Sequence, residues 1–369
     1  MNVKTAFLNR FAEEEIYMDQ PEGFTSVGEE QKNDFDPCVY KKISGSSVAF
    51  LVLYVDDILL IRNDVKTLGD TKARLSTQFS MKDLGEASYI LGIKIIRDRS
   101  KRMLGMTQTS YVEKVLKRFK MENPKQGFLP VRHGVKLSKK QSPKTDEELR
   151  KIFNIPYALA VGSVQYAVQC IRPDIAFALS ITSRYQTCAG EAHWTAVKTI
   201  LKYHRRTKDM VLVYGSGELI LKGYSDGSFQ SDEDDGKSQS GFVFNQDTTV
   251  DSTTETEYIA ASEAAKKAVW MKNYIQELGV VPSIAEPVVI FCDNNRAIAQ
   301  AKEPRSHHRS KHILRRYHLL KKMMGRGDVR MDRVTSAENM ADPLTKPVSQ
   351  IAHVQHLGKM GLRNMSDWL

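Results

Sequence analysis

Short apolar runs in the first quarter of the chain predict β-strands. Residues 48–61 read VAFLVLYVDDILLI, in which two runs rich in Val, Leu and Ile flank the adjacent acids Asp56 and Asp57. Two such runs around a short polar step are typical of antiparallel strands joined by a turn. The pattern predicts a β-hairpin with both aspartates at its tip, then a helix over residues 65–79 and a strand or hairpin arm over residues 88–96.

The segment that follows has the period of an amphipathic helix. Ser110 and Glu113 have the spacing of a capping box that would begin it. The predicted buried face consists of Val112, Val115, Leu116 and Phe119, and the opposite face carries Lys114, Lys117, Arg118 and Lys120. Such a basic face is either solvated or in contact with phosphate groups, and the pattern alone leaves both interpretations open.

Helices and strands then alternate to the end of the chain. Residues 124–150, with three prolines and many lysines, predict a linker or a long loop. Apolar periodicity predicts helices in PYALAVGSVQYAVQC and HWTAVKTILKYHRR. From about residue 218 the expected order is two strands, LILKGYSD and SGFVF, a long helix over residues 253–278 that Gly279 ends, a strand in VVIFCD, and a helix in HILRRYHLLKKMM.

The net positive charge of the chain predicts a polyanionic partner. The formal net charge is +10 and the pI is near 9.2. Between Lys101 and Lys140 there are eleven Lys or Arg and only two Glu, so the positive charge is concentrated there. A local excess of this kind favours binding to a nucleic-acid backbone over a generic basic surface.

Length and cysteine spacing set the broad class. The 369 residues allow two or three domains with ordinary cores. Cys38, Cys170, Cys188 and Cys292 are far apart, which predicts free thiols in a reducing compartment. The longest apolar run is too short to cross a bilayer, and the first residues turn acidic where a signal peptide needs an apolar core. We therefore expect a protein that is neither secreted nor membrane-embedded.

Six acids stand in positions that favour metal binding. Asp56 and Asp57 are adjacent within an apolar hairpin, an arrangement that is costly without a cation between them. A two-metal site there would need a third carboxylate from a neighbouring strand. Four further acids come from four separate predicted elements: Asp226 in a strand, Glu257 in the first turns of the long helix, Asp293 at the end of a strand, and Asp342 before Pro343. Singly each is typical of a surface acid or a helix cap, but together they predict a two-Mg²⁺ site for phosphodiester hydrolysis.

The motifs also resemble a known family. In order along nearly the whole chain, YVDDILLI, MKDLGEASYILGIKI, RPDIA, STTETEYIAASEA, CDNNRAIA, RSKHI and NMADPLTK are similar to the reverse transcriptase and ribonuclease H end of copia-type retrotransposon Pol polyproteins. The resemblance implies a mixed α+β and α/β multidomain fold. Its parts would be a polymerase palm remnant over residues 1–100, a helical thumb or connection over 101–215, a ribonuclease H-like domain over 216–346 and a C-terminal tail over 347–369.

The same resemblance implies roles for the acids. Asp56 and Asp57 would be polymerase carboxylates, whereas Asp226, Glu257, Asp293 and Asp342 would be the catalytic metal ligands of ribonuclease H. Mg²⁺ is the implied cofactor, an RNA–DNA hybrid or another duplex the implied partner, and the cytoplasm or a virus-like particle the implied location.

Four departures from the family predict lost polymerase activity and a doubtful nuclease. The family's third polymerase carboxylate falls at position 2, where this chain has Asn2. The family's fingers would precede the first residue, and a helix that shapes the nucleotide pocket would stand where only TSVGEEQKNDF remains. Only six residues separate Asn245 from Ser252 where the family makes a further strand, so we expect either a strained link or a misplaced Glu257.

Three functions remain open on the sequence. The first is a catalytically silent Pol fragment that binds nucleic acid, the second a residual Mg²⁺-dependent ribonuclease H, and the third a host-recruited nucleic-acid-binding module. Other polar groups have simpler interpretations. His307, His308 and His312 predict a nucleic-acid-facing loop rather than a metal site, and the acidic runs near residues 28 and 232 predict solvated loops. The apolar residues of the helix after them, Ile313, Tyr317, Leu320 and Met324, predict a core face.

Overall fold

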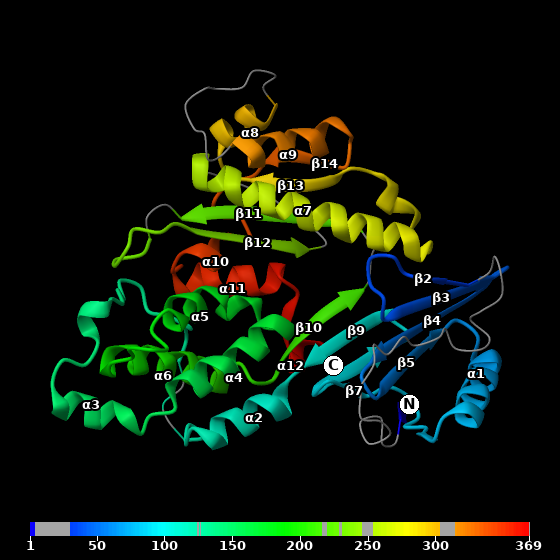
Figure 1. Ribbon diagram of the computed structural model, residues 1–369, viewed down its shortest axis with the longest axis horizontal. Coiled ribbons are helices and arrows are strands. Elements are labelled where there is room, and N and C mark those ends of the chain that lie inside the picture. Colours follow the sequence, from blue (N-terminus) through cyan, green and yellow to red (C-terminus); the bar gives the residue numbers. More distant parts are fainter. Residues whose placement is uncertain are drawn as a thin grey trace, which may run out of the picture. The chain divides into compact units, whose positions relative to one another are not determined.

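The protein has a mixed α/β architecture that divides into two compact units. A computed structural model describes residues 1–3, 30–123, 125, 127–215, 220–228, 231–245, 254–302 and 314–368. Unit 1 comprises Met1–Ser88 and Trp270–Pro282, and unit 2 comprises Tyr89–Val269 and Ser283–Leu369. Figure 1 traces the elements of each unit along the chain.

Unit 1 is built on a six-stranded sheet in the order β2-β3-β4-β5-β1-β6. Its elements are β1 (Asn2–Val3), β2 (Glu30–Lys32), β3 (Val39–Ser44), β4 (Ser47–Tyr54), β5 (Asp57–Arg62), α1 (Val65–Gln78) and β6 (Met81–Lys82). The predicted hairpin is confirmed, because β4 and β5 pair antiparallel with Tyr54 opposite Asp57. Leu51 of the sheet and Leu75 of α1 lie in one buried cluster, so α1 packs on the sheet as its apolar residues require.

A helical core forms the first part of unit 2. It contains α2 (Thr109–Arg118), η1 (Lys139–Gln141), α3 (Asp146–Phe153), α4 (Tyr157–Cys170), η2 (Pro173–Ile175), α5 (Ala176–Ser183) and α6 (Glu191–Arg206). The predicted apolar face of α2 is confirmed, since Val112, Val115, Leu116 and Phe119 all belong to the core cluster with residues of α4, α5 and α6. These helices therefore assemble by burying the apolar stripes that the sequence shows.

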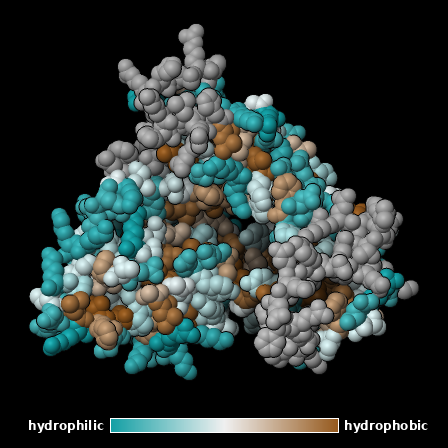
Figure 2. Space-filling model, in the orientation of Figure 1, coloured by the Kyte–Doolittle hydropathy of each residue, from teal (hydrophilic) through white to brown (hydrophobic). Residues whose placement is uncertain are grey.

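One local prediction in this region is wrong, and another holds only in part. The Ser110 and Glu113 capping box does not form, because α2 begins two residues earlier than a Ser110 cap requires, at Thr109, and no side chain caps it. Glu113 instead pairs with Lys208 at 2.6 Å. Residues 124–150 are not simply a linker, because they contain η1 and the start of α3. The apolar residues of α3 face outward, with Phe153 87% exposed, and Figure 2 shows brown atoms at this corner of unit 2.

A five-stranded sheet in unit 2 draws on three of the four predicted domains. Its order is β15-β10-β9-β8-β7, with β7 (Tyr89–Ile90), β8 (Ile93–Asp98), β9 (Met103–Thr107), β10 (Met210–Gly215) and β15 (Leu362–Asn364). The strand β15 follows α11 (Gln350–Lys359), precedes α12 (Met365–Trp368) and pairs antiparallel with β10. The segment predicted as a tail over residues 347–369 is thus folded into unit 2.

A four-stranded sheet completes unit 2 and holds the predicted acids. Its order is β12-β11-β13-β14, with β11 (Lys222–Ser228) antiparallel to β12 (Gln239–Asn245) and parallel to β13 (Val288–Cys292), which is parallel to β14 (Val329–Arg333). The helices around it are α7 (Thr254–Leu278), α8 (Asn295–Lys302), α9 (Leu314–Gly325) and the short α10 (Asp342–Thr345), and η3 (Pro282–Ala285) precedes β13. As predicted, Gly279 follows the end of α7, with φ +71°.

The two faces of this sheet carry different layers. Residues of α7, α8 and α9 pack with Ile290 and Met331 on one face, whereas Leu344 of α10 and Met360 pack with Tyr224 and Phe291 on the other. Leu320 of α9 is fully buried, so that part of the predicted core face is confirmed. Figure 1 shows α8 and α9 above β13 and α10 below β12, with α7 crossing in front of the strands.

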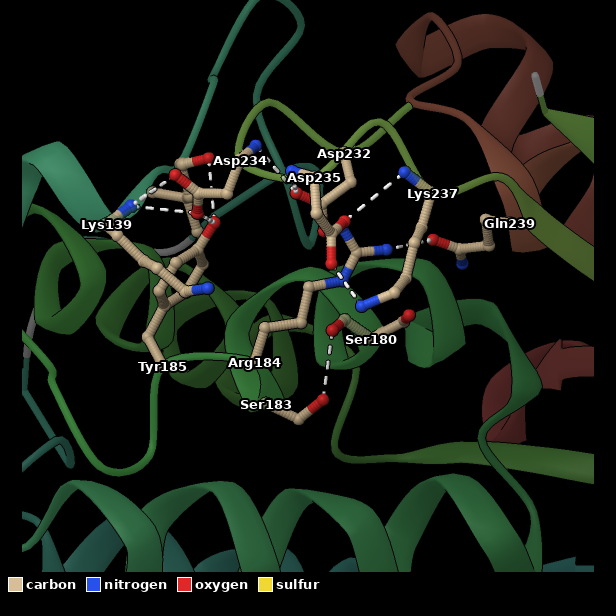
Figure 3. A network of polar contacts seen from close by, with 11 residues as sticks. Lys139, Ser180, Ser183, Arg184, Tyr185, Asp232, Asp234, Asp235, Lys237 and Gln239 are labelled. Carbon is tan, nitrogen blue, oxygen red and sulfur yellow. Dashed lines mark hydrogen bonds and ion pairs between the residues drawn. The ribbon is translucent and has the colours of Figure 1, made fainter. Parts of the chain in front are cut away.

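The acidic loop between β11 and β12 is held in place rather than solvated. Asp232 forms an ion pair with Arg184, and the Asp232 side chain is only 9% exposed. Asp234 accepts hydrogen bonds from the backbone N–H of Lys139, at 2.9 Å to each oxygen, and from the Tyr185 hydroxyl at 3.2 Å. Figure 3 shows these contacts between the loop, η1 and the end of α5. The prediction of a solvated run is wrong for Asp232 and Asp234, because Asp232 pairs with Arg184 and Asp234 accepts hydrogen bonds from groups distant in sequence.

Candidate active site

Three of the six predicted acids converge in unit 2. Asp226 lies in β11, Glu257 in the first turns of α7 and Asp293 directly after β13, and each offers a carboxylate oxygen within 4.8 Å of the other two. The parallel register pairs Ser225 with Cys292, which places Asp226 and Asp293 side by side. All three residues are buried, with at most 1% of their surface exposed, so the carboxylates face one another rather than bulk water.

Asp342 lies beside these three acids and is linked to them through a lysine. It begins α10, and its Oδ1 is 2.9 Å from Nζ of Lys346, which is 3.9 Å from Oδ1 of Asp226. The four predicted nuclease acids are therefore neighbours, although the tight 4.8 Å group contains only the first three. The helix that carries Glu257 points this carboxylate at Asp226 and Asp293, and the connector over residues 246–251 lies outside the described residues.

Polar neighbours that the sequence did not indicate orient the acids. The Thr345 hydroxyl donates a hydrogen bond to Oδ2 of Asp226, and the Ser336 hydroxyl donates one to Oδ2 of Asp293 at 3.0 Å. The Cys292 thiol is 4.0 Å from Oε2 of Glu257. Each of these donors contacts one oxygen of its carboxylate and does not contact the other oxygen. Only NMADPLTK, in which Thr345 and Lys346 follow Asp342, could have suggested the first of these partners.

Burial and the charge of Asp226 disfavour ionisation of Asp342 and Asp293. Burial, together with the charge of Asp226, raises the pKa of Asp342 to about 8 against the opposing effect of Lys346. Burial also raises the pKa of Asp293, and the Ser336 hydrogen bond partly offsets this rise. Burial would lower the pKa of Lys346, but Asp226 and Asp342 outweigh it and the pKa is raised. An additional positive charge at this site would therefore stabilise the ionised carboxylates.

The donor atoms fit a hard divalent cation. Oδ1 of Asp293 is buried and accepts no hydrogen bond from the described residues. A buried carboxylate oxygen without a donor is costly unless a cation or water contacts it. Clustered carboxylate oxygens are the ligands that Mg²⁺ and Mn²⁺ prefer. The residues present are thus compatible with the predicted cofactor.

The other predicted acid pair lies in unit 1 beside position 2. Asp56 is in the turn between β4 and β5, and Asp57 begins β5. Both are half-buried, whereas Tyr54 and Val55 are exposed, so their surroundings are more open than the apolar sequence indicated. In β1, Asn2 is the register partner of Asp57. Position 2 therefore lies on the strand next to the aspartate pair, where a third carboxylate would be needed.

The predicted nucleic-acid-binding residues are exposed on and just beyond α2. Lys114, Lys117, Arg118 and Lys120 all face solvent. Lys114 and Lys117 line a groove of about 540 Å³ together with Arg205 and Lys208, and the acids Glu113 and Glu122 share its lining. The sequence predicted the helix in HWTAVKTILKYHRR but could not show that its end lies beside α2. The histidines His307, His308 and His312 lie outside the described residues.

Comparison with known proteins identifies the family. Residues 31–133 match the family described as reverse transcriptase (RNA-dependent DNA polymerase). The chain is 40% identical, over 94% of its length, to the retrovirus-related Pol polyprotein from transposon TNT 1-94 of Nicotiana tabacum. It is 28% identical over 98% of its length to the corresponding polyprotein from transposon RE2 of Arabidopsis thaliana, and 29% identical over 98% to that from RE1.

The chain therefore belongs to the copia-type retrotransposon Pol polyproteins and includes part of their reverse transcriptase region. It spans 29% of the tobacco relative and 27% of each Arabidopsis relative. No solved structure matches it. Among the described residues, none of the helices has both the length and the apolar character that a membrane crossing requires.

Proposed function

We propose that unit 2 carries a Mg²⁺-dependent ribonuclease H-type activity that cleaves RNA in RNA–DNA hybrids. The observation that carries the proposal is the convergence of Asp226, Glu257 and Asp293, with Asp342 beside them. The sequence favoured a silent fragment because the short connector threatened the position of Glu257. The contact geometry instead supports the nuclease alternative, since this carboxylate lies within the cluster.

The acids and their hydrogen-bond donors would have different roles in this activity. Asp226, Glu257, Asp293 and Asp342 would hold the divalent ions, which supply activation of water and stabilisation of the leaving oxygen when bound. Ser336 and Thr345 would keep Asp293 and Asp226 oriented through the hydrogen bonds described above. Because each acid comes from a different element, the sheet and helices fix their relative positions before substrate binds.

The domain roles follow from the family resemblance. Unit 1 would be a palm remnant without polymerase activity, because Asn2 brings no charge to the strand beside Asp57. The α2 to α6 region of unit 2 would be a thumb or connection, and the β11 to α10 region a ribonuclease H-like domain. The groove beside α2 would follow the phosphate backbone of the hybrid or duplex. The family resemblance places such a protein in the cytoplasm or a virus-like particle.

The direct test is cleavage of a labelled RNA strand in an RNA–DNA hybrid by the full chain. We expect cleavage with Mg²⁺ or Mn²⁺, none in EDTA, and a loss of at least about a hundredfold in Asp226→Asn and Asp293→Asn, since each removes a metal ligand. Asp70→Asn is the matched control, because Asp70 is exposed on α1 and outside the cluster. Absence of hybrid-specific cleavage, or equal cleavage by all variants, would return the protein to the silent-fragment hypothesis.

A further inference from the structure

The ammonium group of Lys346 lies between two of the four acids. Nζ is 2.9 Å from Oδ1 of Asp342 and 3.9 Å from Oδ1 of Asp226. The preceding residue, Thr345, donates its hydroxyl hydrogen to the other oxygen of Asp226. A cation that belongs to the chain itself therefore contacts the carboxylates on the side where α10 meets β11.

The position of this cation conflicts with full occupancy by metal. Two divalent ions would bring four positive charges to four carboxylates, and the ammonium would add a fifth. Like charges a few ångströms apart repel strongly in a partly buried site, where water screens them poorly. Two divalent ions alone balance the four carboxylates, and the ammonium would leave an excess of positive charge, so the lysine and a second ion compete for Asp226 and Asp342.

The lysine is able to leave. Its side chain is 42% exposed, although the two carboxylates it contacts are buried. The residue follows α10 in an extended conformation, and its backbone N–H remains bonded to the Asp342 carbonyl at 3.2 Å. The backbone is thus anchored while a flexible four-carbon stem carries the charge. Rotation of that stem moves the ammonium to solvent without unfolding the site.

We infer that Lys346 is a built-in counter-cation that sets the affinity of the acid site for the second of two divalent ions. This inference rests on the proposed nuclease function, because it takes these acids as ligands of Mg²⁺ or Mn²⁺. Lys346 remains on Asp342 and Asp226 while one ion is bound, and it leaves both carboxylates when a second is bound. It is a positioning residue for the metals, and the resting protein is protected from the repulsion among its own acids.

The test is calorimetric titration of the full chain with Mn²⁺ and with Mg²⁺, in the absence of nucleic acid. Lys346→Met keeps the aliphatic stem and removes the charge, so the dissociation constant of the second ion should fall about tenfold or more. Lys346→Arg keeps the charge and should leave this constant close to that of the wild type. Lys322→Met is the matched control, because Lys322 is an exposed lysine on α9.

A second measurement separates metal affinity from folding. In EDTA, Lys346→Met should melt at a lower temperature than the wild type, and added Mg²⁺ should raise its melting temperature by more. If Lys346→Met gives little folded protein, Lys346→Gln allows the same comparison. An unchanged constant for the second ion in the folded variants overturns the inference and leaves the nuclease proposal intact. Binding by the wild type no stronger than by Asp226→Asn overturns both.

Discussion

At the scale of single residues, the candidate site depends on a close approach between β12 and α10. Gly241 is the register partner of Asp226, and a Cβ built there would lie 2.8 Å from Cβ of Leu344 and 2.9 Å from Cγ2 of Thr345. Any side chain at this position must therefore push α10 away from the sheet. Because α10 supplies Asp342, Thr345 and Lys346, the absence of a side chain at one glycine helps position three polar groups.

Gly241→Ala should weaken both the fold and the metal site. We expect a loss of about 1–3 kcal/mol in the free energy of unfolding, as for other overpacked positions. We also expect weaker Mn²⁺ binding, because Thr345 and Asp342 move together. Urea unfolding and calorimetric titration measure the two effects. Gly162→Ala in α4 is the control, since a Cβ there meets nothing within 4 Å and should instead stabilise the protein by about 1 kcal/mol. Equal free energies of unfolding for the two variants would show that α10 can move away from β12 without destabilising the protein.

A buried histidine adds a pH dependence that is independent of the acid site. His204 of α6 is 3% exposed, and burial, reinforced by Arg172 and opposed by Asp174, lowers its pKa to about 3. The folded protein therefore keeps this imidazole neutral, whereas the unfolded chain takes up a proton below about pH 6.5. Stability contributed by His204 is present above that pH and is lost progressively as the pH falls toward 3.

His204→Leu should reduce the acid lability of the protein. We expect the free energy of unfolding to fall less steeply in this variant than in the wild type between about pH 6.5 and pH 4. Urea unfolding at a series of pH values measures the slope. His133→Leu serves as the comparison, because His133 is exposed in the described structure. Parallel curves for wild type and His204→Leu would mean that other groups dominate acid unfolding.

At the scale of elements, the sequence predicted those helices and strands that depend on residues close together in the chain. The β4–β5 hairpin, the buried face of α2, the long helix α7 and the stop at Gly279 all follow from residues near one another in sequence. The strands β10 and β15 were not predicted, because six and three residues are too short to show a clear periodicity. Their pairing also joins Leu212 to Leu362, which are far apart in sequence. The capping box failed because α2 begins at Thr109 rather than after Ser110, and Glu113 pairs instead with Lys208, which is remote in sequence.

The same limit applies to the candidate site and to a buried ion pair. The acids could be listed from their motifs, but the Thr345 contact with Asp226 spans 119 residues and needed the fold. The motif RPDIA likewise contributes a buried ion pair that the sequence did not indicate. Arg172 and Asp174 pair at 2.8 Å with almost no exposure, and Tyr203 donates a hydrogen bond to Asp174 at 2.7 Å. His353 of α11 lies 2.9 Å from the Tyr203 hydroxyl, so this network joins the C-terminal segment to the helical core.

The groove between α2 and α6 should bind nucleic acid with little regard to sequence. Charge reversal at Lys114, Lys117 and Arg118 should weaken binding to a hybrid or duplex and reduce the salt dependence by about one unit of slope per lost phosphate contact. Fluorescence anisotropy over a range of salt concentrations measures both quantities. Lys322→Glu controls for a single charge reversal elsewhere, because Lys322 is exposed on α9. An unchanged slope in the triple variant would mean that the basic face of α2 only meets solvent.

At the scale of the whole molecule, the two units differ in how completely they retain the acids that metal chemistry needs. Unit 2 brings three carboxylates within 4.8 Å and has a fourth beside them. Unit 1 places Asn2 beside Asp57, so an amide stands where the family resemblance requires an acid. A two-metal site tolerates the loss of an anionic ligand poorly, because the ligands must both position and neutralise the ions. We therefore expect one activity without the other.

The full chain should make no DNA on a primed RNA template under conditions in which it cleaves a hybrid. Asn2→Asp restores the missing charge but should not restore synthesis, because only TSVGEEQKNDF stands where the family resemblance requires the helix that shapes the nucleotide pocket. Primer extension and hybrid cleavage measured on the same preparation make the comparison internal, and Asp56→Asn supplies the polymerase control. Extension by the wild type that disappears in Asp56→Asn would show that Asn2 suffices as a ligand. Extension gained in Asn2→Asp alone would instead show that the lost carboxylate is the whole defect and that the nucleotide pocket is intact.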